Sequence, residues 1–307
     1  MHKEIRNKID ALQEKEQVLI AVLDSGLGGL SICAELENEL QDHVFCQHVA
    51  LLYFNVWPEQ ERGYNSLESV AEQISVFDRA LEGVSNFRPD LIMIACNTLS
   101  IIYDRTPFSR NTNIPVIDIV DFGVDLIHVN LMKNPDSQVL ILGTRTTVSE
   151  KAHQRKLVRK GIDSRRIKGQ ACHGVATEIE KDPHGAAVGK LIDAYMDEAV
   201  HKLNNQGTVF AALCCTHFAY SKVLFKHKLL DRLSGEVVLL NPNTEMSAFL
   251  LKNRRPNSLA TTDIKIKVIS KIVLDQSKIL SMSRAVRIKS QKTAAALIEY
   301  TYQPNLF

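Results

Sequence analysis

The sequence predicts an α/β protein of two pseudo-symmetric halves, each with a mainly parallel sheet between layers of helices, and an active site in the cleft between them. Short apolar runs alternate with amphipathic segments, and several runs end in polar or glycine turns. This alternation indicates βαβ units, whose strands are parallel and covered on both faces. The same order recurs in the second half of the 307 residues, a length that suits two domains.

The first half opens with a charged segment, residues 1–16, in which apolar residues have the spacing of an amphipathic helix. An apolar run then ends at a polar turn that begins with Asp24, as expected for a buried parallel strand. Strands are predicted over residues 17–23, 48–55, 90–98 and 114–120. Helices are predicted over residues 28–40 and 67–84 and from residue 100.

The second half repeats this scheme in four segments, each an apolar strand followed by a turn and a helix: residues 139–150, 165–180, 208–218 and 236–250. Residues 90–98 correspond to 209–217, and residues 18–26 correspond to 139–146. The polar segment 251–263 is expected to be a loop, and residues 265–273 a strand followed by helical patterning to Tyr302.

The repeat sets the expected domain boundaries. One domain is expected to comprise residues 1–119 with 241–307, and the other residues 120–240. Crossings are predicted near Asp118 to Asp121 and near Leu240 to Asn243, because each follows a strand and opens a helix.

The charge balance favours a small-molecule partner over nucleic acid or membrane. Lys and Arg number 37 against 35 Asp and Glu, a net charge of +2, and no run of five basic residues occurs. No apolar run is long enough for a membrane helix, and the N-terminus alternates charges where a signal peptide would be apolar. We therefore expect a cytoplasmic protein whose six cysteines, with no CxxC pair, are reduced.

Two cysteines lie where an α/β sheet binds ligands. Cys96 and Cys215 each follow a predicted strand and precede a predicted helix, and helix N-termini favour a thiolate. His217 is a candidate partner for Cys215, or a cap for backbone groups. The other four cysteines are expected in the core, with Cys172 able to border the cleft: Cys33, Cys46, Cys172 and Cys214.

Two thiols facing one cleft from opposite halves suit removal of a proton from one face of a carbon and its return on the other. That reaction is racemisation or epimerisation. Hydroxyl and amide residues beside the thiols would hold a carboxylate as it gains enolate character: Ser25, Asn97, Thr98, Thr144 and Thr216. Asp24 would hold an ammonium group or assist Cys96 as a base.

Three motifs carry a family resemblance: DSGLGG at residues 24–29, ACNT at 95–98 and CTH at 215–217. In this order they resemble the cofactor-independent aspartate/glutamate racemase superfamily, most closely glutamate racemases, over about residues 17 to 251. The resemblance implies that Cys96 and Cys215 are the two acid/base thiols, assisted by Asp24 and His217 respectively. It implies an amino-acid substrate, no pyridoxal phosphate and no metal; homodimers are common in such enzymes.

The resemblance also implies substrate contacts. Ser25, Asn97, Thr98 and Thr216 would bind the α-amino and α-carboxylate groups. Gly63 and Ser66 match a family loop that holds substrate through its backbone, and Glu180 matches a substrate-side glutamate.

The loop at residues 61–66 departs from the family pattern. Arg62 stands where the family has tyrosine, and it is either a bidentate contact for a substrate carboxylate or a solvated loop charge. Cys214 replaces a glycine, and the last 50 or so residues have no family counterpart. These departures leave the substrate side chain open.

Other functions compete with racemisation of an acidic amino acid. A dinucleotide loop is disfavoured because Ser31 stands in place of the third glycine, and a zinc site at Cys214, Cys215 and His217 because adjacent residues point in different directions. A hydantoin racemase, a related isomerase or a catalytically silent binding protein remains open. A basic tail would suit that last alternative, whereas retention of both thiols argues against it.

Overall fold

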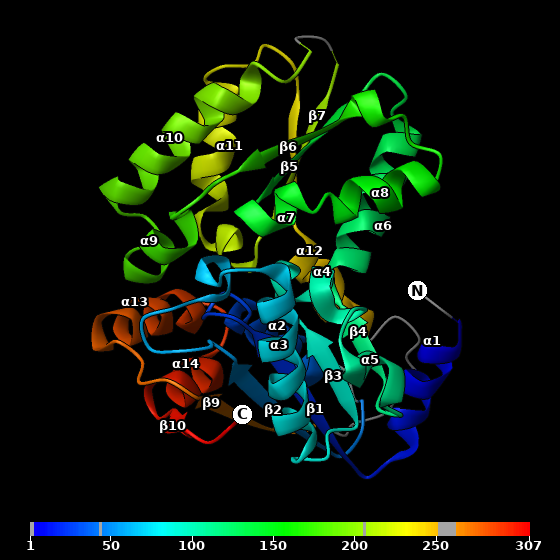
Figure 1. The fold of residues 1–307 in the computed structure, drawn as a ribbon, viewed down its shortest axis with the longest axis vertical. Coiled ribbons are helices and arrows are strands. Elements are labelled where there is room, and N and C mark those ends of the chain that lie inside the picture. The colour runs from blue at the N-terminus through cyan, green and yellow to red at the C-terminus, as the bar shows by residue number, and fades with distance from the viewer. Residues whose placement is uncertain (1–2, 43–44, 205–206, 251–261) are drawn as a thin grey trace.

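The computed structural model describes residues 3–42, 45–204, 207–250 and 262–307. Its strands form a six-stranded sheet, in the order β10-β9-β2-β1-β3-β4, and a four-stranded sheet, in the order β6-β5-β7-β8 (Figure 1). Within the described residues the neighbouring strands of both sheets pair in parallel, as the alternation of strands and helices predicts. The α/β class with two mainly parallel sheets is therefore confirmed.

The larger sheet is built from both ends of the chain. Its strands are β1 (Gln17–Asp24), β2 (His48–Asn55), β3 (Leu91–Ile94), β4 (Val116–Asp118), β9 (Asp263–Ser270) and β10 (Thr301–Tyr302). Its helices are α1 (Lys3–Asp10), α2 (Leu30–Asp42), α3 (Val70–Ser85), α4 (Asn97–Tyr103), α5 (Pro107–Asn111), α13 (Gln276–Arg287) and α14 (Gln291–Ile298), with 3-10 turns η1 (Ala11–Glu14) and η2 (Tyr64–Ser66).

The smaller sheet comes from the middle of the chain. Its strands are β5 (Gln138–Gly143), β6 (Ile167–Ala171), β7 (Val209–Cys214) and β8 (Val237–Leu240). The helices of this stretch are α6 (Ile119–Lys133), α7 (Arg145–Ser149), α8 (Ala152–Arg159), α9 (Val175–Lys181), α10 (Ala186–Val200), α11 (Lys222–Leu230) and α12 (Pro242–Phe249), with 3-10 turns η3 (Ser164–Arg166) and η4 (Thr216–Ser221).

The two sheets repeat one topology. The order β2-β1-β3-β4 in the first matches β6-β5-β7-β8 in the second, so β1 corresponds to β5 and β3 to β7. These are the segments that the sequence pairs as equivalents. The larger sheet differs by β9, which pairs with β2, and by β10 beyond it.

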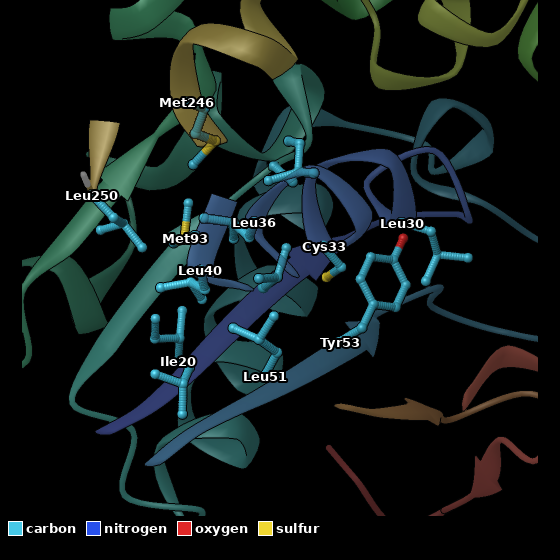
Figure 2. Close-up of a cluster of buried hydrophobic side chains, with 14 of the residues drawn as sticks. Ile20, Leu30, Cys33, Leu36, Leu40, Leu51, Tyr53, Met93, Met246 and Leu250 are labelled. Carbon is cyan, nitrogen blue, oxygen red and sulfur yellow. The ribbon is translucent and has the colours of Figure 1, made fainter. Parts of the chain in front are cut away.

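Buried side chains cover both faces of the larger sheet. On one face Ile20, Leu51 and Met93 of the strands pack against α2 and α12 (Figure 2). A second cluster packs α3 and α4 against the other face. Because both faces of the sheet are covered, its strands are continuous apolar runs in the sequence. Each fully buried Leu or Ile contributes about 1.5–3 kcal/mol to the stability of the fold.

The chain passes between the sheets at two capped helix starts. Asp118 ends β4, and its carboxylate accepts hydrogen bonds from the backbone N–H groups of Val120 and Asp121 at the start of α6. Asn241 caps α12 in the same way through the N–H of Asn243. Helices α6 and α12 pack against each other, so the two crossings are neighbours.

Three local expectations need correction. The N-terminal segment ends its α-helix at Asp10 and continues as η1, and the predicted strand at 114–120 is shortened because α6 begins at Ile119. The tail is two helices, but Tyr302 belongs to the short edge strand β10. Most of the predicted loop 251–263 lies outside the described residues. Among the helices that the structure describes, none is long and apolar enough to cross a membrane.

Candidate active site

A cavity of about 730 Å³ is lined by the carboxyl ends of strands from both sheets. Parallel strands collect their following loops at this edge, where ligands bind in open α/β sheets. Its lining includes all twelve candidate site residues from the sequence: Asp24, Ser25, Gly63, Ser66, Cys96, Asn97, Thr98, Thr144, Glu180, Cys215, Thr216 and His217.

Cys96 lies between β3 and α4, at the N-cap position of the helix, with 7% of its surface exposed. Its Sγ is 3.2 Å from the Oγ of Ser25. Burial, reinforced by the negative charge of Asp24, raises the pKa of the Cys96 thiol to about 12, although the Ser25 hydroxyl opposes the shift. Cys96 therefore carries its proton at neutral pH.

Cys215 lies at the end of β7, in the place that corresponds to Cys96 in the other sheet. It is followed by the 3-10 turn η4 and only then by α11, so it is not at the N-terminus of an α-helix as the sequence predicts. Its Sγ is 3.8 Å from Nδ1 of His217. The imidazole, rather than a helix dipole, is the polar group next to this thiol.

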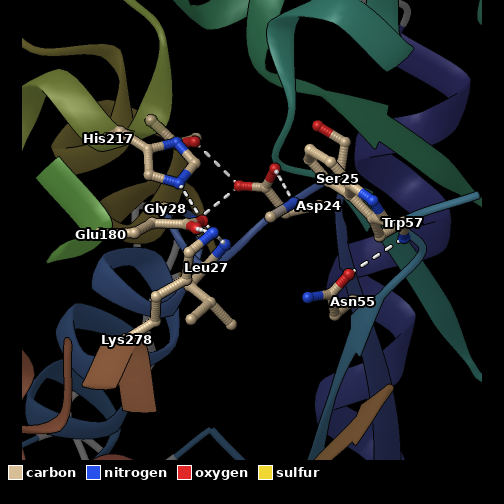
Figure 3. A network of polar contacts seen from close by, with 12 residues as sticks. Asp24, Ser25, Leu27, Gly28, Asn55, Trp57, Glu180, His217 and Lys278 are labelled. Atoms are coloured by element: carbon tan, nitrogen blue, oxygen red, sulfur yellow. Dashed lines mark hydrogen bonds and ion pairs between the residues drawn. The ribbon is translucent and has the colours of Figure 1, made fainter. Parts of the chain in front are cut away.

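His217 is the centre of a buried chain of charges. Its Nε2 is 2.9 Å from Oε1 of Glu180, and Oε2 of Glu180 is 2.9 Å from Nζ of Lys278 (Figure 3). Burial favours neutral His217, but contacts with Cys215 and Glu180 outweigh it and raise its pKa well above the ordinary value. Burial likewise favours neutral Glu180, yet the two cations lower its pKa to about 2. Protonated His217 is the partner that a thiolate at Cys215 requires.

Asp24 joins the two halves of the site. Its Oδ2 accepts hydrogen bonds from the N–H of Gly29, at 2.6 Å, and from the hydroxyl of Thr216, at 2.8 Å. Burial raises the pKa of Asp24, while the charge of His217 opposes this shift. Within the described residues, the hydroxyl of Ser25 rather than the carboxylate of Asp24 is hydrogen-bonded to the Cys96 thiol. Asp24 acts on that thiol through its charge.

Glycines bring the first loop against the second half of the chain. A Cβ on Gly28 would lie 2.3 Å from Oγ1 of Thr216 and 2.5 Å from Nδ1 of His217. One on Gly26 would lie 2.9 Å from Oε1 of Glu180. The repeated glycines of the motif therefore serve a close approach between the halves rather than a phosphate.

Several residues that line the cavity carry polar atoms without a hydrogen-bond partner in the described residues. Both amide atoms of Asn97, the hydroxyl of Tyr64 and the indole nitrogen of Trp57 are buried and lack a hydrogen-bond partner in the part of the chain that the structure describes. Thr98 and Thr144, by contrast, share a hydrogen bond of 3.1 Å across the two halves. Buried polar groups are normally paired, so these orphans point to a ligand.

The loop at residues 61–66 settles the role of Arg62. Its guanidinium forms an ion pair with Glu72 and lies 3.9 Å from Glu59, and it does not line the cavity. The solvated-charge alternative therefore describes it better than a substrate contact. Gly63 does line the cavity, and a Cβ there would strike the ring of Trp57 at 2.4 Å.

The remaining cysteines are buried and free. Cys33, Cys46 and Cys214 belong to the cores, and Cys172 is buried but borders the cavity, as the sequence predicts. Cys214 and Cys215 belong to different clusters, so adjacent thiols point away from each other. Across the described ranges no group of three or more His, Cys, Asp or Glu side chains is arranged to hold a metal ion.

The cavity residues that sequence reasoning missed include Trp57, Tyr64 and Lys278. Trp57 follows the carboxyl end of β2, and that position in an α/β sheet could have signalled it. Tyr64 directly follows the glycine of the altered loop. Lys278 lies in the tail, where no local pattern points to the site.

A family model described as Asp/Glu/hydantoin racemase matches residues 20–241. The chain belongs to this family. The glutamate racemase of Aquifex pyrophilus is 25% identical over 234 residues, which cover 75% of this chain and 81% of that one. Family membership indicates an isomerase, and the family is the one that the three motifs resemble.

Solved structures of glutamate racemases share the fold. One from Bacillus anthracis has a TM-score of 0.68 at 19% identity and covers 88% of this chain and 94% of its own. One from Francisella tularensis, in complex with D-glutamate, has a TM-score of 0.67 at 20% identity, with 90% and 96% covered. At these identities the likeness shows the architecture and leaves the substrate of this racemase-family protein to its own residues.

Proposed function

We propose that this protein racemises glutamate or a related acidic amino acid, using Cys96 and Cys215 as the acid/base pair. The observation that carries the proposal is that two buried thiols, one at the end of the third strand of each sheet repeat, line a single cavity. A binding protein needs neither thiol. A decarboxylase on the same scaffold needs one.

The proposed chemistry exchanges a proton at Cα. One cysteine, as thiolate, takes the α-proton, and the electron pair stays on the carbon as the carboxylate gains enolate character. The other cysteine, as thiol, gives its proton to the opposite face, so the electron pair forms a new C–H bond and the first thiol keeps the original proton. The α-proton is a very weak acid, so hydrogen-bond donors to the carboxylate must lower the barrier.

The proposal assigns these donors to residues at the strand ends. Asn97, whose amide has no partner among the described residues, and the hydroxyls of Ser25, Thr98, Thr144 and Thr216 would hold the α-carboxylate and α-ammonium groups. Gly63 and Ser66 would contribute backbone contacts. Asp24 would balance the ammonium charge, and His217 with Glu180 would support Cys215. The mechanism requires neither pyridoxal phosphate nor a metal.

An acidic amino acid is the favoured substrate class for two reasons. The curated relatives that match this chain include glutamate racemases, and one solved relative is a complex with D-glutamate. The cavity wall also carries an exposed cation, Arg145, beside Thr144. A hydantoin has no ammonium group for Asp24 to balance, so it is the second candidate.

Proton exchange in D2O tests the proposal. The purified protein is incubated separately with L- and D-glutamate and L- and D-aspartate, and the α-proton signal is followed by NMR. Loss of the signal from both enantiomers of one compound supports racemisation and identifies the substrate. Absence of exchange across this panel, with the thiols shown to be reduced, would overturn it; a hydantoin panel then separates the second candidate from a silent binding protein.

We further propose that residues 1–119 with 241–307 form one domain and residues 120–240 the other. The division follows the two capped crossings into α6 and α12, and it assigns each thiol to its own domain. The expected homodimer remains a prediction.

A further inference from the structure

The tail of the chain reaches the active-site cavity through Lys278. This residue lies in the first turn of α13, whose N-terminus is capped by Asp275. Helix α13 packs against α9, which carries Glu180, and α9 packs in turn against η4, which carries His217. Three elements from distant parts of the sequence thus place three side chains in a row (Figure 3).

Glu180 is held from three sides. Its Oε1 accepts a hydrogen bond from the N–H of Leu27, at 3.0 Å, and contacts Nε2 of His217, while its Oε2 contacts Nζ of Lys278. The side chains of Glu180 and His217 are 9% and 8% exposed, and that of Lys278 is 30% exposed. A carboxylate buried this deeply needs partners for both oxygens, and Lys278 is the partner of the second one.

We propose that Lys278 is a positioning residue for proton transfer at Cys215. By fixing one oxygen of Glu180, it aims the other at His217 and so holds the imidazole against the Cys215 thiol. The inference rests on the proposed racemisation, since it assigns a task within it. The C-terminal helix α13 would thus support proton transfer at Cys215, whereas Cys96 has a separate partner in Ser25.

This asymmetry calls for an assay that reads each thiol alone. Racemisation cannot do so, because its equilibrium constant is one and kcat/KM must stay equal in the two directions. Elimination from the L and D forms of 3-chloroglutamate can. One thiolate takes the α-proton, the C–H electron pair forms the Cα–Cβ double bond, and chloride leaves with the Cβ–Cl pair; water then releases ammonium and 2-oxoglutarate.

The first variant is Lys278→Met, with Cys215→Ala identifying the enantiomer that depends on Cys215. We expect kcat for elimination from that enantiomer to fall tenfold or more, because a misplaced base loses its near-attack geometry. Elimination from the other enantiomer should stay within twofold. Lys278→Arg, which keeps the charge, should recover most of the loss.

Two controls separate positioning from structure. Lys289→Met breaks an ion pair with Glu35 that ties the same tail to α2 without touching the cavity, and it should behave as wild type. In a Glu180→Gln background, Lys278→Met should cost nothing further if Lys278 acts through Glu180. Thermal unfolding of each variant monitors the fold.

The opposing results are distinct. Equal losses for both enantiomers with a raised KM would make Lys278 a substrate contact, and equal losses in Lys278→Met and Lys289→Met would make it structural; either overturns the inference. Full activity in both Lys278→Met and Lys278→Arg would do the same. A wild-type protein that eliminates from neither enantiomer and exchanges the α-proton of neither glutamate nor aspartate in D2O would instead remove the proposed function and, with it, this inference.

Discussion

The two thiols differ in the groups that surround them. Cys96 has a hydroxyl neighbour, Ser25, and the nearby charge of Asp24, whereas Cys215 has the imidazole of His217. A pair of bases with unlike partners need not share one protonation state, and the proposed reaction requires one thiol and one thiolate in each turnover. The chemical difference between the two sides therefore suits the proposed exchange.

Loss of either thiol should abolish racemisation. Cys96→Ala and Cys215→Ala each remove the base for one enantiomer and the proton donor for the other, so turnover should fall by about a thousandfold or more in both directions. Chiral chromatography of glutamate measures the rate. Cys214→Ala is the matched control, because this adjacent thiol faces the core and its loss should affect stability alone. Near-full turnover in both directions in either active-site variant would refute the two-base mechanism.

His153 should make stability depend on pH. It is a buried residue of α8 whose ring lies beside Gly123 of α6, and neither ring nitrogen has a hydrogen-bond partner among the described residues. Burial lowers its pKa to about 4. Since unfolded histidine titrates near 6.5, the unfolded state binds more protons between pH 6.5 and 4. The free energy of unfolding should therefore fall by about 3 kcal/mol as the pH drops through this range.

Urea denaturation at a series of pH values checks this expectation. His153→Leu removes the titrating group, so its stability should change less than that of wild type below pH 6.5. Parallel curves for the two proteins would show that His153 does not make this contribution.

At the scale of elements, the loop after β1 approaches η4 so closely that it leaves no room for a side chain at Gly28. Gly28→Ala would place a Cβ 2.3 Å from Oγ1 of Thr216, which is hydrogen-bonded to Asp24. The loop and η4 must then separate, and turnover should fall about a hundredfold. Gly189→Ala is the control: its Cβ would meet nothing within 4 Å inside α10, and it should stabilise the protein by about 0.5–1 kcal/mol. Equal activity of the two variants would contradict the argument.

Local patterns predict most elements because strands and helices have different periods. The buried strands read as apolar runs, and α3 starts where Ser69 can accept a hydrogen bond from the N–H of Glu72. Motifs at strand ends predict the positions of Cys96 and Cys215, since topology brings those ends together. The 3-10 turn after Cys215 has no signal in the sequence, because helix type over one turn depends on tertiary contacts.

Long-range contacts explain what the sequence could not predict at the site. Lys278 reaches Glu180 across 98 positions of the chain. The choice between two roles for Arg62 depended on Glu72, which lies on the next helix. Neither contact has a signature within one segment, so both required the folded chain.

At the scale of the molecule, the tail completes the larger sheet. Strand β9 lies between β2 and β10, and its buried Ile264 and Val268 join the cluster that packs against α2 and α12. The family match ends at residue 241, but the folded unit extends well beyond it. Buried apolar residues of the tail include Ile264, Val268, Ile279, Met282, Val286 and Leu297.

Removal of residues 263–307 should therefore prevent stable folding. It uncovers the edge of β2 and removes burial worth about 1.5–3 kcal/mol for each large apolar side chain, against a typical net stability of about 5–15 kcal/mol. Circular dichroism and size-exclusion chromatography of the shortened chain measure the outcome. A monomer with cooperative unfolding near the wild-type temperature would show that the tail is dispensable.

In the proposed division into two domains, the neighbouring crossings at α6 and α12 would limit the motion that opens the cavity. Two chain connections that lie side by side act as a hinge. Rotation of one domain about the line through them costs little, whereas sliding of the domains would stretch both connections. Hydrogen bonds between the halves, such as that between Thr98 and Thr144, would then stabilise the closed form. A single angle between the domains would then describe the opening of the cavity, and small-angle X-ray scattering with and without substrate would measure it.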